Sequence, residues 1–230
     1  MKRTKLKDRT LPDYTKGEEI FNSVSHGVGV AFGIAALVLC VVMAALRGNA
    51  RAVVSAAIYG SMMILLYTAS TLYHGITNTF AKKVFQVIDH CVIFFLIAGS
   101  YTPITLVTLH DINPACGWSL FGVVWGITII GCVFTAIDWE KFNILSMICY
   151  LGMGWCIIFF IVDVAKALGV GGTVFLAVGG VLYTIGAILY SIGHRHRYFH
   201  SVFHLFVLSG SVTHFFMILF YILPCERPLF

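Results

Sequence analysis

The sequence predicts an all-α integral membrane protein with seven transmembrane helices, its N-terminus in the cytosol and its C-terminus outside. Of its 230 residues, 59% are hydrophobic and 11% are charged, whereas soluble domains are about one-quarter charged. Seven spans of about 20 residues would take roughly 140 residues and leave only short connections. Composition and length therefore predict one membrane domain and exclude a water-soluble globular protein.

Seven apolar runs, bounded by charged residues, glycine or proline, have the length of a membrane span. In chain order they cover residues 23–46, 53–74, 85–109, 116–137, 143–165, 172–193 and 200–223. This pattern divides the chain into a basic tail with a lead-in (1–22), a seven-helix domain (23–223) and a short outer tail (224–230).

The amino-terminal segment is polar and basic, and the apolar run that follows it is too long and lacks a small-residue cleavage site. A removed signal peptide is therefore not expected. Glu18 and Glu19 beside Ile20 and Phe21 fit a short interfacial lead-in to the first span. They fit a solvated tail equally well.

The distribution of Lys and Arg predicts the orientation. With the N-terminus inside, eleven of the 15 basic residues fall on the inner face and four on the outer face. The positive-inside rule then favours a cytosolic N-terminus in a plasma membrane.

Two classes of site are not expected. The net charge of +5 comes without a basic stripe or a nucleic-acid-binding motif, so nucleic acid is not an expected partner. The seven cysteines show no CxxC or CxxxC pairing and lie mostly inside apolar runs. We interpret them as small buried residues and not as disulfides or a zinc ribbon.

Ionisable residues within the spans are the default place to look for chemistry, because they are costly in a membrane. His74 ends the second run, Asp89 lies near the start of the third, and His200 and His204 lie in the first turns of the seventh. The predicted topology places all four residues at one depth, near the inner boundary.

This set predicts a metal site. His200 and His204 are four residues apart, so they share one helix face. With His74 they would give three ligands and an open fourth position, as in catalytic zinc sites. Asp89 would either hold the metal-bound water or ligate directly. Imidazoles with a carboxylate and without cysteine suit Zn²⁺, although a lone intramembrane histidine is more often a hydrogen-bonding residue.

Further polar residues could support this site. Ser70 lies one turn before His74 and could bond its own helix backbone or act around the metal as a catalytic residue. Glu19, Asn22 and His26 are spaced along one helical stripe. They could hydrogen-bond between spans, and we favour support of the metal ligands over direct ligation.

Other ionisable residues are expected to lie apart. His214 is about 15 Å beyond His204 along the helix, Asp163 lies near the outer end of its span, and His90 is rotated about 100° from Asp89. The final span lacks the lysine that a retinal protein needs. Two histidines one turn apart cannot ligate opposite faces of a haem.

Several separated motifs resemble the progestin and adipoQ receptor superfamily, and most closely its short, bacterial haemolysin III-type branch. They are Glu19/Asn22/His26, the segment STLYH ending at His74, DHCVIFFLIAGSYTP from Asp89, and HSVFH from His200 continuing to GSVTH at His214. The resemblance covers essentially the whole chain. It implies seven helices, a cytosolic N-terminus, and zinc bound near the cytosolic side by His74, His200 and His204, with Asp89 at the metal-bound water and Ser70 nearby.

Three functions follow as expectations. The first is a zinc-dependent intramembrane hydrolase of a lipid amide or ester, because the resemblance extends to receptors associated with ceramidase-like hydrolysis and to proteins linked to membrane-lipid homeostasis. The second is a non-enzymatic sensor or receptor with structural zinc. The third is a pore-forming haemolysin, although its polar residues cluster at one depth instead of lining a path through the membrane.

Overall fold

The computed structural model describes residues 3–193 and 196–224, and these residues form helices and no strand. The α-helices are α1 (Lys16–Arg47), α2 (Ala50–Gly75), α3 (Thr79–Pro103), α4 (His110–Ile112), α5 (Pro114–Trp155), α6 (Ile161–Ile192) and α7 (Phe199–Met217). Short 3₁₀ or π-helical stretches cover Leu6–Asp8, Ile104–Leu109, Cys156–Phe160 and Ile218–Ile222. Most of the outer tail predicted at 224–230 lies outside the described residues.

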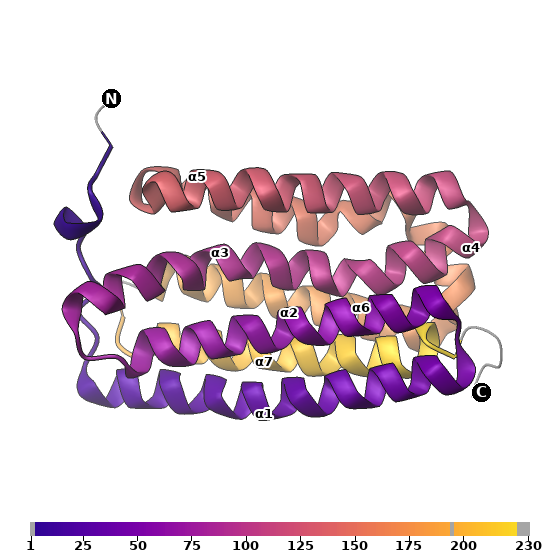
Figure 1. The fold of residues 1–230 in the computed structure, drawn as a ribbon, viewed down its shortest axis with the longest axis horizontal. Coiled ribbons are helices and arrows are strands. Elements are labelled where there is room, and N and C mark those ends of the chain that lie inside the picture. Colours follow the sequence, from indigo (N-terminus) through magenta and orange to yellow (C-terminus); the bar gives the residue numbers. More distant parts are fainter. Residues whose placement is uncertain (1–2, 194–195, 225–230) are drawn as a thin grey trace.

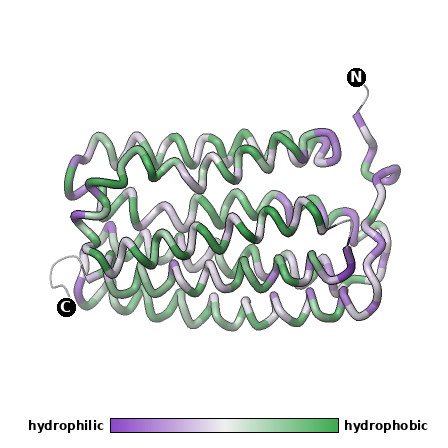
Figure 2. The backbone as a smooth tube through the Cα atoms, turned by 180° about the vertical axis from the view of Figure 1, so that it is seen from behind, coloured by the Kyte–Doolittle hydropathy of each residue, from purple (hydrophilic) through white to green (hydrophobic). Residues whose placement is uncertain are grey.

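The long helices lie side by side in one bundle (Figure 1). Helix α1 packs against α2 and α7, α2 against α3, α3 against α5, and α6 against α7. Hydrophobic residues run along the helices, while hydrophilic residues gather at the helix ends and in the amino-terminal segment (Figure 2). This distribution is what a membrane-embedded bundle requires.

The described residues do not form seven separate helices, so that predicted count is wrong. Five helical stretches are long and apolar enough to cross a membrane, and one of them runs from Pro114 to Ile192. The loops predicted within this stretch are reduced to breaks with non-helical backbone at Asp138 (φ −159°, ψ 87°) and Gly169 (φ 66°, ψ −175°). Glycine tolerates the positive φ at the second break.

Helix α1 begins at Lys16, seven residues before the predicted apolar run, because Thr15 and Glu18 form a capping box. The Thr15 hydroxyl accepts a hydrogen bond from Glu18 N at 3.2 Å, and Thr15 N donates to Glu18 Oε2 at 2.8 Å. The helix therefore carries Glu19 and Asn22 within its first turns.

Small residues bring α1 close to α2. The ring of Tyr67 lies against Gly29 and the side chain of Ile64 lies against Gly33, where a Cβ atom would collide or crowd. Small residues let membrane helices approach closely and gain van der Waals contact. This packing fixes the polar ends of α1 and α2 beside each other.

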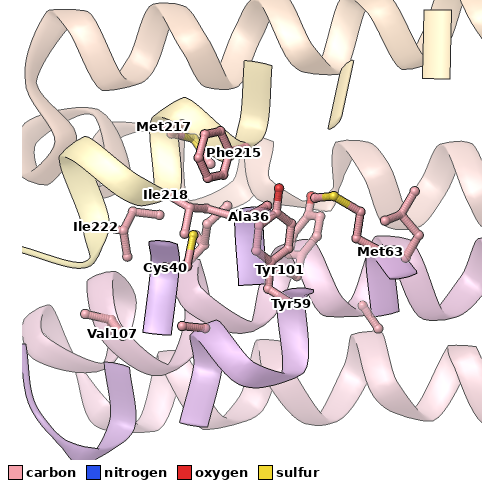
Figure 3. Packing of buried hydrophobic residues seen from close by; sticks show 14 of the residues in the cluster. Ala36, Cys40, Tyr59, Met63, Tyr101, Val107, Phe215, Met217, Ile218 and Ile222 are labelled. Carbon is pink, nitrogen blue, oxygen red and sulfur yellow. The ribbon is translucent and has the colours of Figure 1, made fainter. Parts of the chain in front are cut away.

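The apolar core is shared by all the long helices, α1, α2, α3, α5, α6 and α7. Ala36 and Cys40 of α1 face Tyr59 and Met63 of α2 within one buried cluster, which Phe215 completes from α7 (Figure 3). The cysteines that the structure describes are free thiols. Of these, Cys40 is buried as predicted, whereas Cys91, Cys116, Cys132, Cys149 and Cys156 are only partly buried. Cys225 lies outside the described residues.

Candidate metal centre and adjoining cavity

Three buried histidines meet at one end of the bundle. His74 lies in the last turn of α2, and His200 and His204 lie in the first two turns of α7. Helices α3 to α6 separate α2 from α7 in sequence, but α1 packs against both α2 and α7 and so holds these helix ends together. The structure thus brings together the three ligands predicted from sequence.

The three imidazoles point their Nε2 atoms toward one another. His200 Nε2 lies 3.4 Å from His74 Nε2 and 3.0 Å from His204 Nε2. One nitrogen from each residue lies within 4.8 Å of the other two, so the cluster could hold a metal ion. Two ligands at zinc–nitrogen distances of 2.0–2.1 Å in a tetrahedral site would be about 3.3 Å apart. The donor set and its spacing fit a metal ion.

Glu19 orients the first ligand. Its Oε2 accepts a hydrogen bond from His74 Nδ1 at 2.7 Å, and its Oε1 forms a 2.8 Å ion pair with Lys82. The proton on Nδ1 leaves the Nε2 lone pair of His74 free for a metal ion. A carboxylate bonded to the second nitrogen of a histidine ligand is a common arrangement in metal sites. The ion pair of Lys82 with Glu19 was not predicted from the sequence, where Lys82 was used only to orient the protein in the membrane.

Asn22 and His26 lie beside the histidine cluster but outside its ligand group. The ring of His26 stacks on that of His204, with centroids 3.7 Å apart. Both ring nitrogens of His26 and both amide atoms of Asn22 are buried without a hydrogen-bond partner among the described residues. The position of both side chains is compatible with the predicted supporting role, and their unpaired atoms leave capacity for water or ligand.

Ser70 and Asp89 line a cavity next to the cluster. Neither residue belongs to the three-histidine group that could hold a metal ion. The Ser70 hydroxyl lies beside the Asp89 carboxylate, and His26, which stacks on His204, also lines the cavity. Asp89 is thus outside the ligand group but on the wall of the cavity next to it.

The cavity is mainly apolar. Its walls come from α1, α2, α3, α5, α6 and α7, and they enclose a cavity of about 140 Å³. Ligand cavities are commonly lined by apolar side chains with few polar groups. The apolar lining includes Leu66, Ile97, Leu151 and Phe203. The space suits an apolar chain whose polar end would meet Asp89.

An amino-terminal strap, residues 3–15, covers the histidine cluster. The ring of Tyr14 stacks on that of His200, with centroids 5.0 Å apart and an interplanar angle of 25°. Burial raises the pKa of the Tyr14 phenol well above its usual range, so the side chain stays neutral. Sequence reasoning treated this segment as a tail, and no local pattern marks Tyr14 as a contact of His200.

The carboxylate of Glu18, in the first turn of α1, fastens that helix to the segment just before α7. Glu18 Oε1 accepts a hydrogen bond from Tyr198 N at 2.7 Å, and Glu18 Oε2 pairs with Arg197 at 3.3 Å. Tyr198 has a left-handed backbone (φ 62°), which costs free energy for a non-glycine residue. The Glu18 bond holds this turn in place. It therefore fixes where α7 begins, one residue before His200.

The remaining predicted residues lie apart from the ligand group. His90 Nδ1 bonds the Gln86 carbonyl at 2.6 Å, and His90 Nε2 bonds the Tyr190 hydroxyl at 2.9 Å. His214 bonds the Leu176 carbonyl at 3.3 Å, and Asp163 is exposed. Tyr190, which lines the cavity, was not singled out from sequence.

Comparison with known proteins agrees with the motif resemblance. Residues 14–215 match the Haemolysin-III related family. The chain is 41% identical to Hemolysin-3 of Bacillus cereus over 207 residues, covering 90% of this chain and 93% of that protein. It is 40% identical to the Hemolysin-3 homolog of Bacillus subtilis (strain 168), covering 90% and 96%.

A more distant match is the human monocyte to macrophage differentiation factor, at 24% identity over 172 residues, 72% of this chain and 69% of that protein. This weaker similarity connects the bacterial proteins to the progestin and adipoQ receptors. Together with the apolar helices described above, these matches establish that the chain is an integral multi-pass membrane protein and belongs to the haemolysin III family.

Proposed function

We propose that the protein is a zinc-dependent intramembrane hydrolase that cleaves a lipid amide or ester. One observation carries this proposal: three convergent imidazoles lie beside a mainly apolar cavity whose wall presents Asp89 and Ser70. A lipid chain would occupy the cavity, and its carbonyl group would lie between the histidine cluster and Asp89.

Zinc is the metal that these donors favour, since neutral imidazoles without a thiolate suit it well. His74, His200 and His204 would hold the ion. A zinc ion bound there would supply Lewis-acid chemistry, which polarises a carbonyl group and acidifies water.

The side chains around the cluster then have separate roles. Asp89 would accept a proton from the attacking water as its oxygen bonds to the carbonyl carbon, and would return that proton to the amine or alcohol that leaves. Ser70, beside Asp89, would hydrogen-bond the water or the carbonyl oxygen. Glu19 keeps His74 in the orientation and tautomer required for ligation.

The same proposal includes a cytosolic N-terminus and seven membrane crossings made by the five long helical stretches, three of them within Pro114–Ile192. The breaks at Asp138 and Gly169 divide Pro114–Ile192 into three helical parts, which support two reversals within it. The excess of Lys and Arg at the strap end supports its cytosolic placement. The strap with the start of α1 would be the cytosolic lead-in, and the histidine cluster would lie near the inner membrane surface.

The decisive test combines metal analysis with lipid hydrolysis. Purified full-length protein should contain near-stoichiometric zinc and release fatty acid from at least one amide or ester in a lipid panel, whereas Asp89→Asn should keep the zinc and lose the release. Zinc without turnover on any lipid would overturn the hydrolase and leave the sensor with structural metal. Absence of zinc from the parent protein would overturn both.

The name of the Bacillus cereus relative, Hemolysin-3, refers to a lytic function. Among the described residues, the buried ionisable side chains other than His214 lie toward the strap end of the bundle, which does not favour a polar path through it. We therefore expect reconstituted protein to leave a trapped dye inside liposomes, and dye release would favour a pore over the hydrolase.

A further inference from the structure

Two cysteines face each other across the contact between α3 and α5. The Sγ atom of Cys132 lies 3.3 Å from the carbonyl oxygen of Cys91, and the Sγ atom of Cys91 lies 3.7 Å from the carbonyl oxygen of Cys132. The two thiols also lie beside each other. Cys156, by contrast, bonds the Met153 carbonyl three residues before it. Each sulfur of the Cys91–Cys132 pair is therefore within one side chain's reach of the other.

The backbones of the two helices approach closely at this point. Gly131 precedes Cys132, and the ring of Phe94 lies where it would collide with a Cβ atom on Gly131. The Thr128 hydroxyl donates from α5 to the Phe94 carbonyl of α3 at 3.4 Å. A disulfide requires Cα atoms about 4.4–6.8 Å apart, and a small residue at a helix contact lets the backbones come close. The α3–α5 contact thus suits a bond between the two sulfurs.

The pair lies at the apolar outer surface of the bundle. Cys91 and Cys132 are only partly buried. Ile88 on α3 and Ile129 on α5 lie one turn before them on the same helix faces, and both isoleucines are exposed. In a membrane-embedded bundle this surface meets the hydrocarbon chains of lipids. A reactant that approaches the two thiols from this side therefore has to dissolve in the membrane.

We propose that Cys91 and Cys132 form a dithiol site that a membrane-soluble quinone oxidises to a disulfide between α3 and α5. Both S–H bonds break and one S–S bond forms, while two electrons and two protons pass to the quinone, which becomes a hydroquinone. A dithiol reductant reverses the step by thiol–disulfide exchange. The proposal depends neither on the hydrolase nor on a metal ion.

The disulfide joins α5 to the part of α3 that lies beside the cavity. Cys91 is two residues from Asp89, which lines the cavity. The next residue, His90, accepts a hydrogen bond at its carbonyl from the Tyr150 hydroxyl at 2.7 Å, and Tyr150 lines the cavity from the second half of α5. In the reduced protein, noncovalent contacts hold α5 to α3 here. The covalent bond restricts their separation next to Asp89.

The test uses purified full-length protein in a neutral detergent, with a short-chain ubiquinone as the oxidant and the matching ubiquinol as the control. Free thiols are alkylated, and the digested protein is analysed by mass spectrometry before and after reduction. We expect the quinone to remove two alkylatable thiols and to produce one linked peptide pair that contains Cys91 and Cys132. The ubiquinol cannot accept the electrons and should produce no link. The link should raise the melting temperature by about 5 °C, and dithiothreitol should reverse the rise.

Matched variants tie the bond to this pair. Cys91→Ser and Cys132→Ser should each prevent both the link and the rise in melting temperature. Cys149→Ser changes another partly buried cysteine of α5 and should leave both results unchanged. The proposal is overturned if the quinone leaves Cys91 and Cys132 alkylatable, links either of them to a different cysteine, or adds to a thiol without forming a disulfide. The linked peptides of the parent protein decide this even if a variant fails to fold.

Discussion

Two buried polar clusters in this bundle differ in how their atoms are paired. In the middle of the bundle, the hydroxyl of Ser211 bonds both Tyr67 and Tyr183 at 2.8 Å, and Tyr59 bonds the Ser211 carbonyl at 3.4 Å. At the strap end, the histidine nitrogens face one another, and His26 and Asn22 have no partners among the described residues.

This difference separates a polar cluster that stabilises the fold from one that is suited to a ligand. Every hydroxyl in the middle cluster has a protein partner, so it joins α2, α6 and α7 without outside help. The histidine cluster has donors and acceptors in excess of its own bonds, and such groups are costly to bury unless something else satisfies them. Four variants, each with a matched control or readout, test this contrast.

The largest effect is expected for His200→Ala/His204→Ala. Removing two of three ligands should reduce zinc content from near-stoichiometric to background, because a single imidazole with water holds zinc weakly. Metal analysis of purified protein measures this loss. Ser211→Ala, a buried change on the same helix, should retain the zinc; loss of zinc in that variant would erase the contrast between the clusters.

Asp89→Asn should lower the rate of lipid hydrolysis by about 10²–10⁴-fold while leaving zinc in place, because the amide cannot accept the proton. Fatty-acid release from the best lipid of the panel gives the rate. Asp163→Asn makes the same chemical change at an exposed position and should leave the rate of lipid hydrolysis unchanged. Equal rates in the parent protein and Asp89→Asn would remove Asp89 from the proposed reaction.

A smaller effect is expected for Glu19→Gln. The amide still reaches His74 but no longer carries the charge that favours the required tautomer, so zinc affinity should fall about 10–100-fold. Competition with a chelator measures it. Glu140→Gln alters a carboxylate that bonds Thr10 instead of a histidine, and unchanged affinity is expected there. If both variants bind zinc like the parent, Glu19 is not a positioning residue.

Tyr67→Phe should have the smallest effect and should act on stability alone. Hydrogen bonds between membrane helices contribute about 0.6 kcal/mol on average, so the free energy of unfolding should fall by roughly that amount with zinc content unchanged. Reversible unfolding in detergent would measure the loss. A fall in zinc affinity would instead mean that the middle cluster and the histidine cluster are coupled.

Sequence reasoning predicted the part of the site that follows from helix geometry. Because His200 and His204 are one turn apart and His74 ends a preceding apolar run, their common depth could be inferred before any contact was known. The structure places all three together. The roles of Asp89, Ser70 and Glu19 remain predictions, although each side chain lies at or beside the cluster.

The missed features depend on contacts that local patterns do not encode. Thr4 bonds Asp138 across 134 positions in sequence, so nothing near Thr4 or Tyr14 predicts a strap. The count of separate helices failed at Asp138 and Gly169 for a different reason. Hydropathy marks where apolar runs weaken, but it does not show whether the chain passes through a loop or through a single non-helical residue.

The strap also has a consequence for the order of assembly. Its anchors at Ile137, Asp138 and Glu140 are synthesised more than 120 residues after the strap itself. His200, which Tyr14 covers, is made later still. The first segment to leave the ribosome therefore cannot dock on α5 before residues 137–140 are made. Tyr14 cannot cover the histidine cluster until His200 has been added, so this contact completes the site. A bulky fusion at the N-terminus would act on this last step and leave the insertion of the helices unaffected.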